Sequence, residues 1–473
     1  MRELLVTALC LVFMVGASQA QDNRPDVLFI SIDDLNDWVE PLGGHPQSIT
    51  PNLTALAERG MTFTNAHTAA ALCNPSRTSL MLGLHPNTTG IYGNSPNWQM
   101  VPRLADLPTI PRQFRDNGYY TAGAGKLFHA ATFNAALYAG YNDQSAWYEY
   151  YPSLDRQLPD EITPHNRPQN NNPFTPNLDW GAVSADDRAM GDGQVVAWSA
   201  DQITTQIDQP RFNAVGIYRP HAPWYVPQKY LDMYPLEEVI LPEVPIDDMV
   251  DVPDAGRNIY HSNQMPPTAF FEWAQSSGEW QAGVQAYLAS VTFADAMVGE
   301  ILEALEQSGR ADNTIIVLWS DHGWHLGEKH RWRKHTLWEE ATHVPLIVVA
   351  PGLTEPGSSS GQAVSLMDIY PTLMELTGLD APDYLEGRSL VPLIEDPDAE
   401  WDHVALSTFG FQNHAVRSER YRYIRYADGS EELYDHQTDS NEWHNLASDP
   451  AYARIKAELQ QRLPQENAPN EAQ

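Results

Sequence analysis

Two short apolar segments each end close to residues that can bind a cation. Residues 27–32 are followed by Asp33-Asp34, and residues 314–319 by Asp321-His322. Buried parallel strands are apolar throughout and present polar side chains at their carboxyl ends, so we expect both pairs at one edge of a sheet. Three carboxylates and an imidazole suit a divalent cation, and the excess of oxygen favours Ca²⁺ over Zn²⁺. Taken alone, each aspartate could be a helix N-cap or turn residue, and His322 a core histidine.

A third chemical feature is Cys73, which lies where a helix is expected to start. In the run Cys73-Asn74-Pro75-Ser76-Arg77, Asn74 is a good N-cap residue and Pro75 suits the first helical position. Amide donors and the helix dipole favour an anion there, and Arg77 can neutralise charge beside Cys73. The alternative is that Cys73 is a small buried apolar residue.

The run from Cys73 to Arg77 resembles the Cys-x-Pro-Ser-Arg signature of the formylglycine-dependent type I sulfatases. The resemblance implies that a formylglycine-generating or anaerobic maturing enzyme oxidises Cys73 to formylglycine, whose hydrated aldehyde is the nucleophile. The family pattern usually continues as Leu-Thr-Gly-Arg, whereas this chain has Met81-Leu82-Gly83-Leu84.

Other segments resemble the family in the same order along the chain. Asp33-Asp34 and Asp321-His322 resemble its two metal-binding pairs, residues 125–129 its Gly-Lys-x-x-His segment, and residues 219–224 its Pro-His-x-Pro segment. Residues 321–334 and 86–92 resemble the iduronate-2-sulfatases, and residues 432–447 the family's C-terminal hairpin. The resemblance implies one calcium ion held by Asp33, Asp34, Cys73, Asp321 and His322, and a catalytic set of Cys73, Arg77, Lys126, His129, His221 and Lys334.

Each residue of that catalytic set has an implied role. Arg77, Lys126 and Lys334 would surround the sulfuryl group with positive charge. His221 would protonate the departing alcohol, and His129 would remove the second proton of the hydrated aldehyde. Taken singly, Lys126 could be a surface charge and His221 a loop residue.

The elements that must position these residues alternate between strand and helix. We expect strands at 27–32, 61–64, 119–123, 212–218, 314–319 and 345–349, and helices at 50–59, from about 73, and at 108–117, 185–207, 284–308 and 367–377. This alternation predicts an α/β fold with a large, mostly parallel sheet flanked by helices. The resemblance implies the alkaline-phosphatase-like version of that fold.

The pattern changes near the C-terminus. Short strands are expected at 414–417, 421–426 and 432–434, with a hairpin signal at Asp428-Gly429 and a helix near 452–463, forming a small antiparallel-sheet subdomain. Residues 131–182 and 235–267 lack a sustained period and are expected to be irregular, the first shaping a cleft, and the tail after Pro464 to be disordered. These features divide the chain into a signal peptide (1–20), a catalytic domain (21–380) and a C-terminal subdomain (381–473).

The signal peptide follows from a charged start, an apolar run from Leu4 to Val15, and small residues at Ser18 and Ala20. It predicts a secreted or periplasmic protein. Cleavage removes Cys10 and leaves Cys73 as the one cysteine, so no intrachain disulfide can form. The net charge of −34 argues against nucleic-acid and anionic-membrane partners. An anionic substrate would therefore need a local basic pocket.

The resemblance implies hydrolysis of sulfate esters, on sulfated sugars if the iduronate-2-sulfatase likeness extends to the substrate. Arg331 and Arg333 could then bind a sugar carboxylate. Two alternatives are a phosphatase or phosphonate monoester hydrolase on the same fold, and an inactive protein that binds sulfated glycans.

Overall fold

The structure is a computed structural model that describes residues 24–130, 141–160, 178–260 and 266–471. Its centre is an eight-stranded sheet in the order β13-β2-β12-β9-β1-β7-β4-β5. The middle strand, β1 (Asp26–Ile32), pairs in parallel with β9 (Thr314–Ser320) and β7 (Arg211–Ile217). Next to β7 lies β4 (Tyr120–Gly125), again parallel. The four strands that precede the predicted site residues are therefore adjacent and point the same way.

The sheet as a whole is mixed. Strand β12 (Leu346–Val349) runs antiparallel to both β9 and β2 (Met61–Phe63), while β13 (Ser358–Ser360) pairs with β2 in parallel. The predicted α/β fold with a large, mostly parallel sheet is confirmed, with β12 as the strand that breaks the parallel order.

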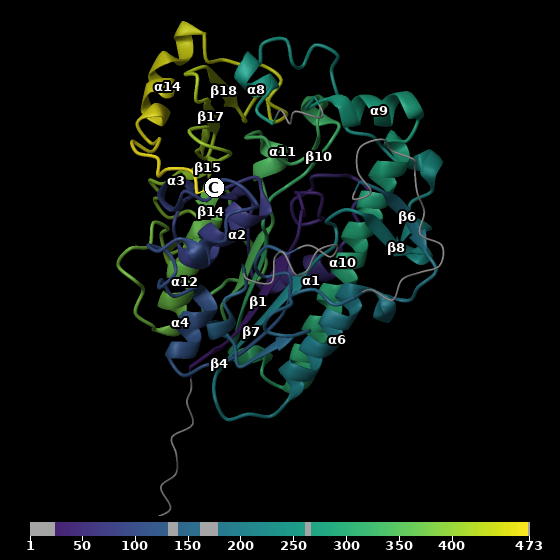
Figure 1. The fold of residues 1–473 in the computed structure, drawn as a ribbon, viewed down its shortest axis with the longest axis vertical. Helices are drawn as coiled ribbons and strands as arrows, with labels where there is room; N and C mark the ends of the chain where they lie inside the picture. The colour runs from purple at the N-terminus through teal and green to yellow at the C-terminus, as the bar shows by residue number, and fades with distance from the viewer. Residues whose placement is uncertain (1–23, 131–140, 161–177, 261–265, 472–473) are drawn as a thin grey trace, which may run out of the picture.

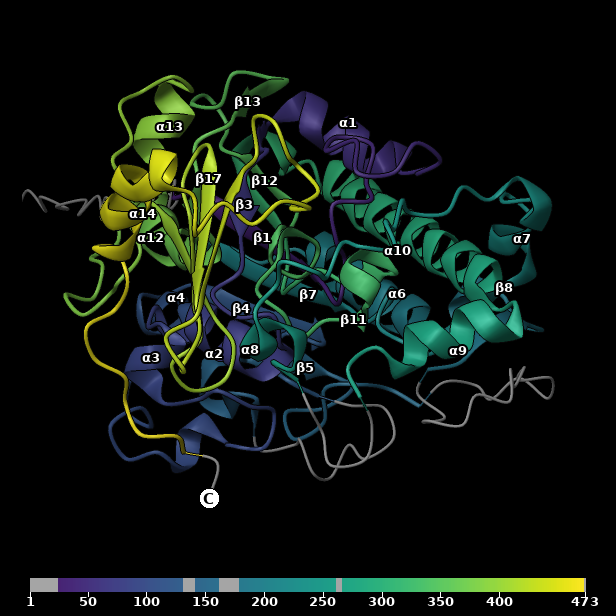
Figure 2. The same ribbon diagram turned by 90° about the horizontal axis from the view of Figure 1, so that it is seen from above.

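Helices cover both faces of this sheet (Figures 1 and 2). One face carries α1 (Pro51–Arg59), α6 (Gly191–Thr204) and α10 (Trp280–Ser308), and the other α2 (Cys73–Leu82), α4 (Ile110–Asp116) and α12 (Ile369–Thr377). Successive side chains of β1 alternate between two apolar cores: Leu28, Ile30 and Ile32 pack in the first, Val27 and Phe29 in the second. Burial on both faces explains why β1 is apolar throughout.

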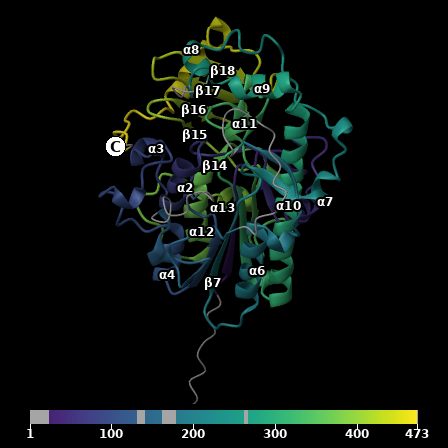
Figure 3. The same ribbon diagram turned by 45° about the vertical axis from the view of Figure 1, so that its right-hand side comes forward.

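A separate four-stranded antiparallel sheet lies near the C-terminus, at one end of the molecule beside α8 (Asp254–Arg257) (Figures 1 and 3). It contains β15 (Ala405–Thr408), β16 (His414–Arg417), β17 (Tyr421–Arg425) and β18 (Glu431–Asp435), and α14 (Ala453–Gln460) packs against it. The predicted sheet, its hairpin and the terminal helix are confirmed. Strand β15 was not predicted.

The tail beyond Pro464 is ordered as far as Glu471, so the prediction of disorder is wrong for these residues. The backbone amide of Ala468 donates to the Asn87 carbonyl (2.6 Å), and that of Glu471 to Gly90 (3.0 Å). Arg103 Nη1 also pairs with the Glu471 carboxylate at 2.5 Å. These long-range contacts supply the order that local sequence does not specify.

The region expected to be irregular contains two strands. β5 (Glu149–Tyr151) extends the main sheet beside β4, and β6 (Trp180–Val183) pairs with β8 (Trp224–Pro227). Both strands are too short to show a period of alternating side chains. They form because they pair with neighbouring strands of the folded protein, which local sequence does not reveal. Two parts of the predicted cleft loop, 131–140 and 161–177, lie outside the described residues.

The signal-peptide prediction also falls outside the described residues, and the division at residue 380 stays a prediction. Among the helices that the structure describes, none combines the length and apolar character needed to cross a membrane.

Candidate active site

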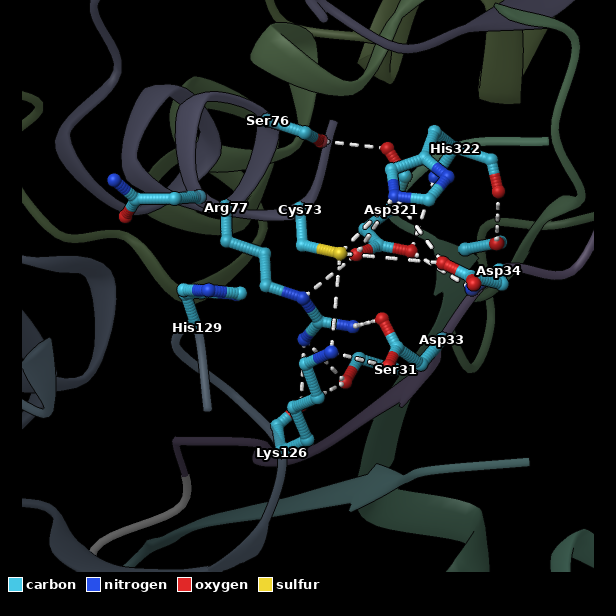
Figure 4. A network of polar contacts seen from close by, with 12 residues as sticks. Ser31, Asp33, Asp34, Cys73, Ser76, Arg77, Lys126, His129, Asp321 and His322 are labelled. Carbon is cyan, nitrogen blue, oxygen red and sulfur yellow. Dashed lines mark hydrogen bonds and ion pairs between the residues drawn. The ribbon is translucent and has the colours of Figure 1, made fainter. Parts of the chain in front are cut away.

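Four neighbouring strands deliver the predicted site residues to one edge of the sheet. β1 is followed by Asp33-Asp34, β9 by Asp321-His322, β4 by Lys126, and β7 within four residues by His221. Because these strands are parallel and adjacent, their carboxyl ends converge, and Figure 4 shows Asp33, Asp34, Asp321, His322 and Lys126 around the Cys73 sulfur. The expected convergence at a sheet edge is confirmed.

The turn after β1 is fixed by hydrogen bonds that orient Asp34. Its φ of 61° lies in the left-handed region, which aspartate tolerates better than most residues. The Asp34 amide donates to Asp321 Oδ1 (3.0 Å), and its carbonyl accepts from the Tyr287 hydroxyl (2.8 Å) on α10. These bonds hold the Asp34 carboxylate toward His322, whose Nε2 is 3.3 Å from Asp34 Oδ1.

Cys73 begins helix α2, as predicted, but the predicted cap is wrong. The helix starts at Cys73 itself, after Leu72, and no side chain caps it. Asn74 lies inside the first turn and donates its side-chain amide to the carbonyls of Gly93 (3.0 Å) and Pro96 (2.8 Å). The loop that provides these acceptors is distant in the sequence, so local capping rules could not reveal them.

Cations surround the Cys73 sulfur, which is buried with the residue 1 % exposed. Lys334 Nζ lies 3.0 Å away, His322 Nε2 3.3 Å and Lys126 Nζ 3.8 Å. Burial raises the pKa of the thiol, but Lys126 and Lys334 outweigh burial and hold the pKa well below its usual value. The position therefore favours a negatively charged group.

Arg77 ties two strand ends together from one turn along α2. Its Nε donates to Asp321 Oδ2 (2.8 Å) and its Nη2 to Asp33 Oδ1 (3.0 Å), while Nη1 donates to the carbonyls of Lys126 (2.5 Å) and Leu127 (3.1 Å). The side chain is fully buried. A planar fork of donors suits this bridging, so Arg77 fixes the spacing of β1 and β9 as well as adding charge.

Three carboxylates are matched by three cations within this cluster. Lys126 pairs with Asp33, Lys334 Nζ lies 2.6 Å from Asp34 Oδ1, and Arg77 bridges Asp33 and Asp321. Burial raises the pKa of Asp33, yet Lys126 brings it below its usual value. Burial raises the pKa of Asp321 to about 6 despite Arg77, a cost that a nearby cation would offset.

Two histidines complete the predicted set. His129 is buried, and burial lowers its pKa to about 4 although the neighbouring Cys73 raises it, so the ring is neutral at neutral pH. His221 is 22 % exposed and its Nδ1 lies 2.7 Å from the Ala222 carbonyl. A carbonyl only accepts, so Nδ1 carries the proton and Nε2 faces Asp34 Oδ2 at 3.8 Å.

The donor set fits a divalent cation. One ligand atom from each of Asp34, Cys73, Asp321 and His322 lies within 4.8 Å of the others, and a second group contains Asp33, Asp34 and His221. Asp34 Oδ2 is buried without a hydrogen-bond donor, which leaves it available to an ion. His322 Nδ1 lies 3.1 Å from the Gly323 carbonyl, so its Nε2 is the nitrogen that can coordinate.

Some functional residues had no role assigned from the sequence. Ser76, inside the signature, donates its hydroxyl to the Asp321 carbonyl (2.6 Å) and so holds the second metal-binding pair against α2. Tyr287 orients Asp34 from the middle of a long helix, where nothing in the sequence distinguishes it from a core aromatic residue. Gly83 ends α2 with φ 72°, which explains why this glycine of the family pattern is present while its neighbours differ.

Of the two arginines proposed to bind a sugar carboxylate, Arg331 is the more buried. It is 3 % exposed, donates to the Arg257 carbonyl (2.6 Å) and lies over the Trp338 ring. Its Nη2 anchors the loop around α8, and sugar-carboxylate binding stays a prediction for both arginines. Both arginines line a pocket that also includes Lys334.

The sequence profile described as "Sulfatase" matches residues 25–379, three quarters of the chain and every residue of this site. The chain belongs to the sulfatase family. A second profile, described as "N-sulphoglucosamine sulphohydrolase, C-terminal", matches residues 327–469. This sulfatase hydrolyses sulfate esters, and the predicted family and enzyme class are confirmed.

Two relatives show how broadly the similarity extends. The sulfatase is 41 % identical over 454 residues to a protein named "Sulfatase" from Formosa agariphila, covering 95 % of this chain and 88 % of the relative. It is 29 % identical over 435 residues to human iduronate 2-sulfatase, covering 80 % and 74 %. The similarity spans both sheets.

Solved structures confirm the fold. A phosphonate monoester hydrolase from Silicibacter pomeroyi superposes with a TM-score of 0.75 at 24 % identity, covering 93 % of this chain and 94 % of the other. A protein solved in complex with its substrate D-glucosamine-2-N,6-O-disulfate gives 0.72 at 22 % identity, covering 93 % and 97 %. The alkaline-phosphatase-like sheet and the smaller C-terminal sheet are shared.

Proposed function

We propose that this sulfatase removes sulfate from sulfated sugars after export from the cytoplasm, using formylglycine made from Cys73 and one bound calcium ion. The observation that supports this most strongly is the environment of the Cys73 sulfur, which lies among two lysines, a histidine and a carboxylate. Human iduronate 2-sulfatase, a relative over most of its length, carries a name that specifies a sulfated sugar acid.

Asp33, Asp34, Asp321 and His322, together with the group at residue 73, would hold the ion. When bound, calcium would polarise the sulfate ester and formylglycine would supply an oxygen nucleophile at the position of the Cys73 sulfur. The chain contributes the surrounding charge: because its own three cations and three carboxylates balance, an added divalent ion makes the site locally positive. This local charge lets an overall acidic protein attract an anionic ester.

Lys126 and Lys334 are placed to orient the sulfate. Both ammonium groups lie within 4 Å of the Cys73 sulfur, at 3.8 and 3.0 Å, so an ester placed against residue 73 would contact both. Fixed cations aimed at the reacting group stabilise charge that develops on its oxygens and need no reorganisation during the reaction.

His221 and His129 are placed to move protons. His221 Nε2 faces the centre from the partly exposed side, where a departing sugar oxygen would leave, so a protonated ring there can act as general acid. His129 is close enough to Cys73 for the two to influence each other's pKa, and it is neutral, so it can accept a proton from the group at residue 73. His221 would thus donate a proton to the leaving group, and His129 would accept one from the group at residue 73.

The two alternative functions predict different behaviour. A phosphatase or phosphonate monoester hydrolase would prefer phosphorus esters, and the solved phosphonate monoester hydrolase shows that the fold permits this. An inactive glycan-binding protein would bind sulfated sugars without releasing sulfate. The cysteine surrounded by cations and the two histidines favour catalysis over binding alone, and the match to the sulfatase family favours sulfate over phosphorus esters.

The experiment that tests the proposal is a substrate panel. Protein co-expressed with a formylglycine-generating enzyme should release sulfate from sulfated oligosaccharides, and its kcat/KM for aryl sulfate should exceed that for the matching aryl phosphate and phosphonate by at least about tenfold, a difference near 1.4 kcal/mol in barrier. Preference for phosphorus, or binding without release, would contradict it.

Replacing His221 should show leaving-group dependence. In His221→Ala, we expect kcat on a sulfated sugar, whose alkoxide leaves poorly, to fall by roughly 10²–10⁴-fold, the usual contribution of a general acid. Turnover of 4-nitrophenyl sulfate should fall far less, because its phenolate needs little protonation. Equal losses on both substrates would show that His221 does not protonate the leaving group.

A further inference from the structure

Arg333 is a cation without a partner beside the catalytic centre. Its guanidinium makes no hydrogen bond or ion pair with any other residue in the described part of the chain, and its Nε is buried. Asp and Glu outnumber Lys and Arg by 62 to 28 in this sequence, so carboxylates that could pair with an arginine are abundant. A partly buried guanidinium that stays unpaired in such a chain can bind an anion supplied by a ligand.

The backbone directs Arg333 into the pocket that Lys334 also lines. Neighbouring side chains normally point to opposite faces of a strand, but Arg333 has a φ of 89° and His335 of 81°. As a result Arg333, Lys334 and His335 all line one pocket. Backbone held in the left-handed region at bulky residues is costly and concentrates at functional sites.

The segment is held in place by a short hairpin. Strand β11 (Trp332–Arg333) pairs with β10 (His325–Leu326), with Arg333 opposite His325. His325 Nε2 also lies 2.7 Å from the Thr336 hydroxyl, so the chain is held to β10 both at Arg333 and three residues after it. Arg333 is therefore placed by its supporting backbone and not by a salt bridge.

The pocket joins this arginine to the reacting centre through Lys334. Lys334 lines the pocket and its Nζ lies 3.0 Å from the Cys73 sulfur. Burial lowers the pKa of Arg333, while Tyr260 and the negative charges of Asp34 and Cys73 raise it, as expected for a group close to that centre. Tyr260, 41 % exposed and stacked on His335 with ring centroids 4.0 Å apart, adds a flat aromatic wall.

We propose that Arg333 recognises a second oxyanion, a carboxylate or another sulfate, on the same sugar whose scissile sulfate contacts Lys334. The inference rests on the proposed function and adds a preference for doubly anionic sugars. A guanidinium can bind either oxyanion through two parallel N–H donors. Arg333 is then a specificity residue, and singly charged sulfate esters leave it unsatisfied.

Binding to an unreactive protein tests this without maturation. In Cys73→Ala, calorimetry should give a Kd for a 2-O-sulfated hexuronate, or for a disulfated hexosamine, at least about tenfold lower than for its carboxyl-reduced or monosulfated counterpart. Adding Arg333→Gln should bring the ratio close to one, and Arg333→Lys should leave it intermediate because the charge stays but the fork is lost. The pair with the large ratio identifies the oxyanion.

A matched control is Arg112→Gln, which removes the same charge from the surface of α4 and should keep the parental ratio. Equal affinity of the parent for both members of each pair would overturn the inference, as would a ratio that survives Arg333→Gln. Absence of sulfate release from every ester by the matured wild type would instead overturn the proposed function.

Discussion

Cys73→Ala should reduce hydrolysis of every sulfate ester by roughly 10⁴-fold or more, because loss of a covalent nucleophile leaves only binding and electrostatic stabilisation. The residue is buried at the start of α2 among cations, and alanine is smaller, so folding should survive. Steady-state sulfate release, with the thermal midpoint measured in parallel, checks both statements. Turnover close to that of the wild type would remove Cys73 from the mechanism.

Cys73→Ser refines the same test. Serine has a single hydroxyl, so it offers an attacking oxygen but no second hydroxyl from which His129 could remove a proton. At most one equivalent of alcohol should be released per enzyme, seen as a burst without steady-state turnover. Repeated turnover by Cys73→Ser would contradict the requirement for a hydrated aldehyde.

Calcium removal is the second large effect. Chelation should lower kcat/KM by roughly 10²–10⁴-fold, since a Lewis-acid metal contributes several kcal/mol. It should also lower the thermal midpoint, because an ion present at a hundred times its Kd stabilises the folded state by about 2.7 kcal/mol. The control is Asp321→Asn, which removes one charge from the four-residue metal group and should abolish the response of the midpoint to calcium. A midpoint indifferent to calcium in the wild type would contradict a bound ion.

The sequence was sufficient for the framework of this site because its signals are local and strong. Apolar runs before Asp33 and Asp321 predicted two strands correctly, and parallel topology then required their ends to meet. The signature around Cys73 predicted a helix start. Alternation of strands and helices predicted the layered fold, although the antiparallel direction of β12 depends on how the chain returns to the sheet.

What the sequence did not predict depends on partners distant along the chain. Asn74 is oriented by carbonyls of residues 93 and 96, and Asp34 by Tyr287. The tail beyond Pro464 has the composition of a disordered segment and is ordered by backbone bonds to residues 87 and 90. Arg331 and Arg333 look equivalent in the sequence, and only the fold shows that Arg331 donates to the Arg257 carbonyl while the Arg333 guanidinium makes no hydrogen bond with another described residue.

The central claim is that the sulfur of residue 73 is replaced by an aldehyde beside a divalent ion. It is tested most directly by the mass of the tryptic peptide from Gly60 to Arg77. This peptide contains residue 73, and its one lysine or arginine is the C-terminal Arg77. In active enzyme this peptide should be lighter by the difference between a thiol-bearing and an aldehyde-bearing side chain, and the modified fraction should track specific activity. Full activity from protein in which this peptide retains only the intact thiol would contradict the claim.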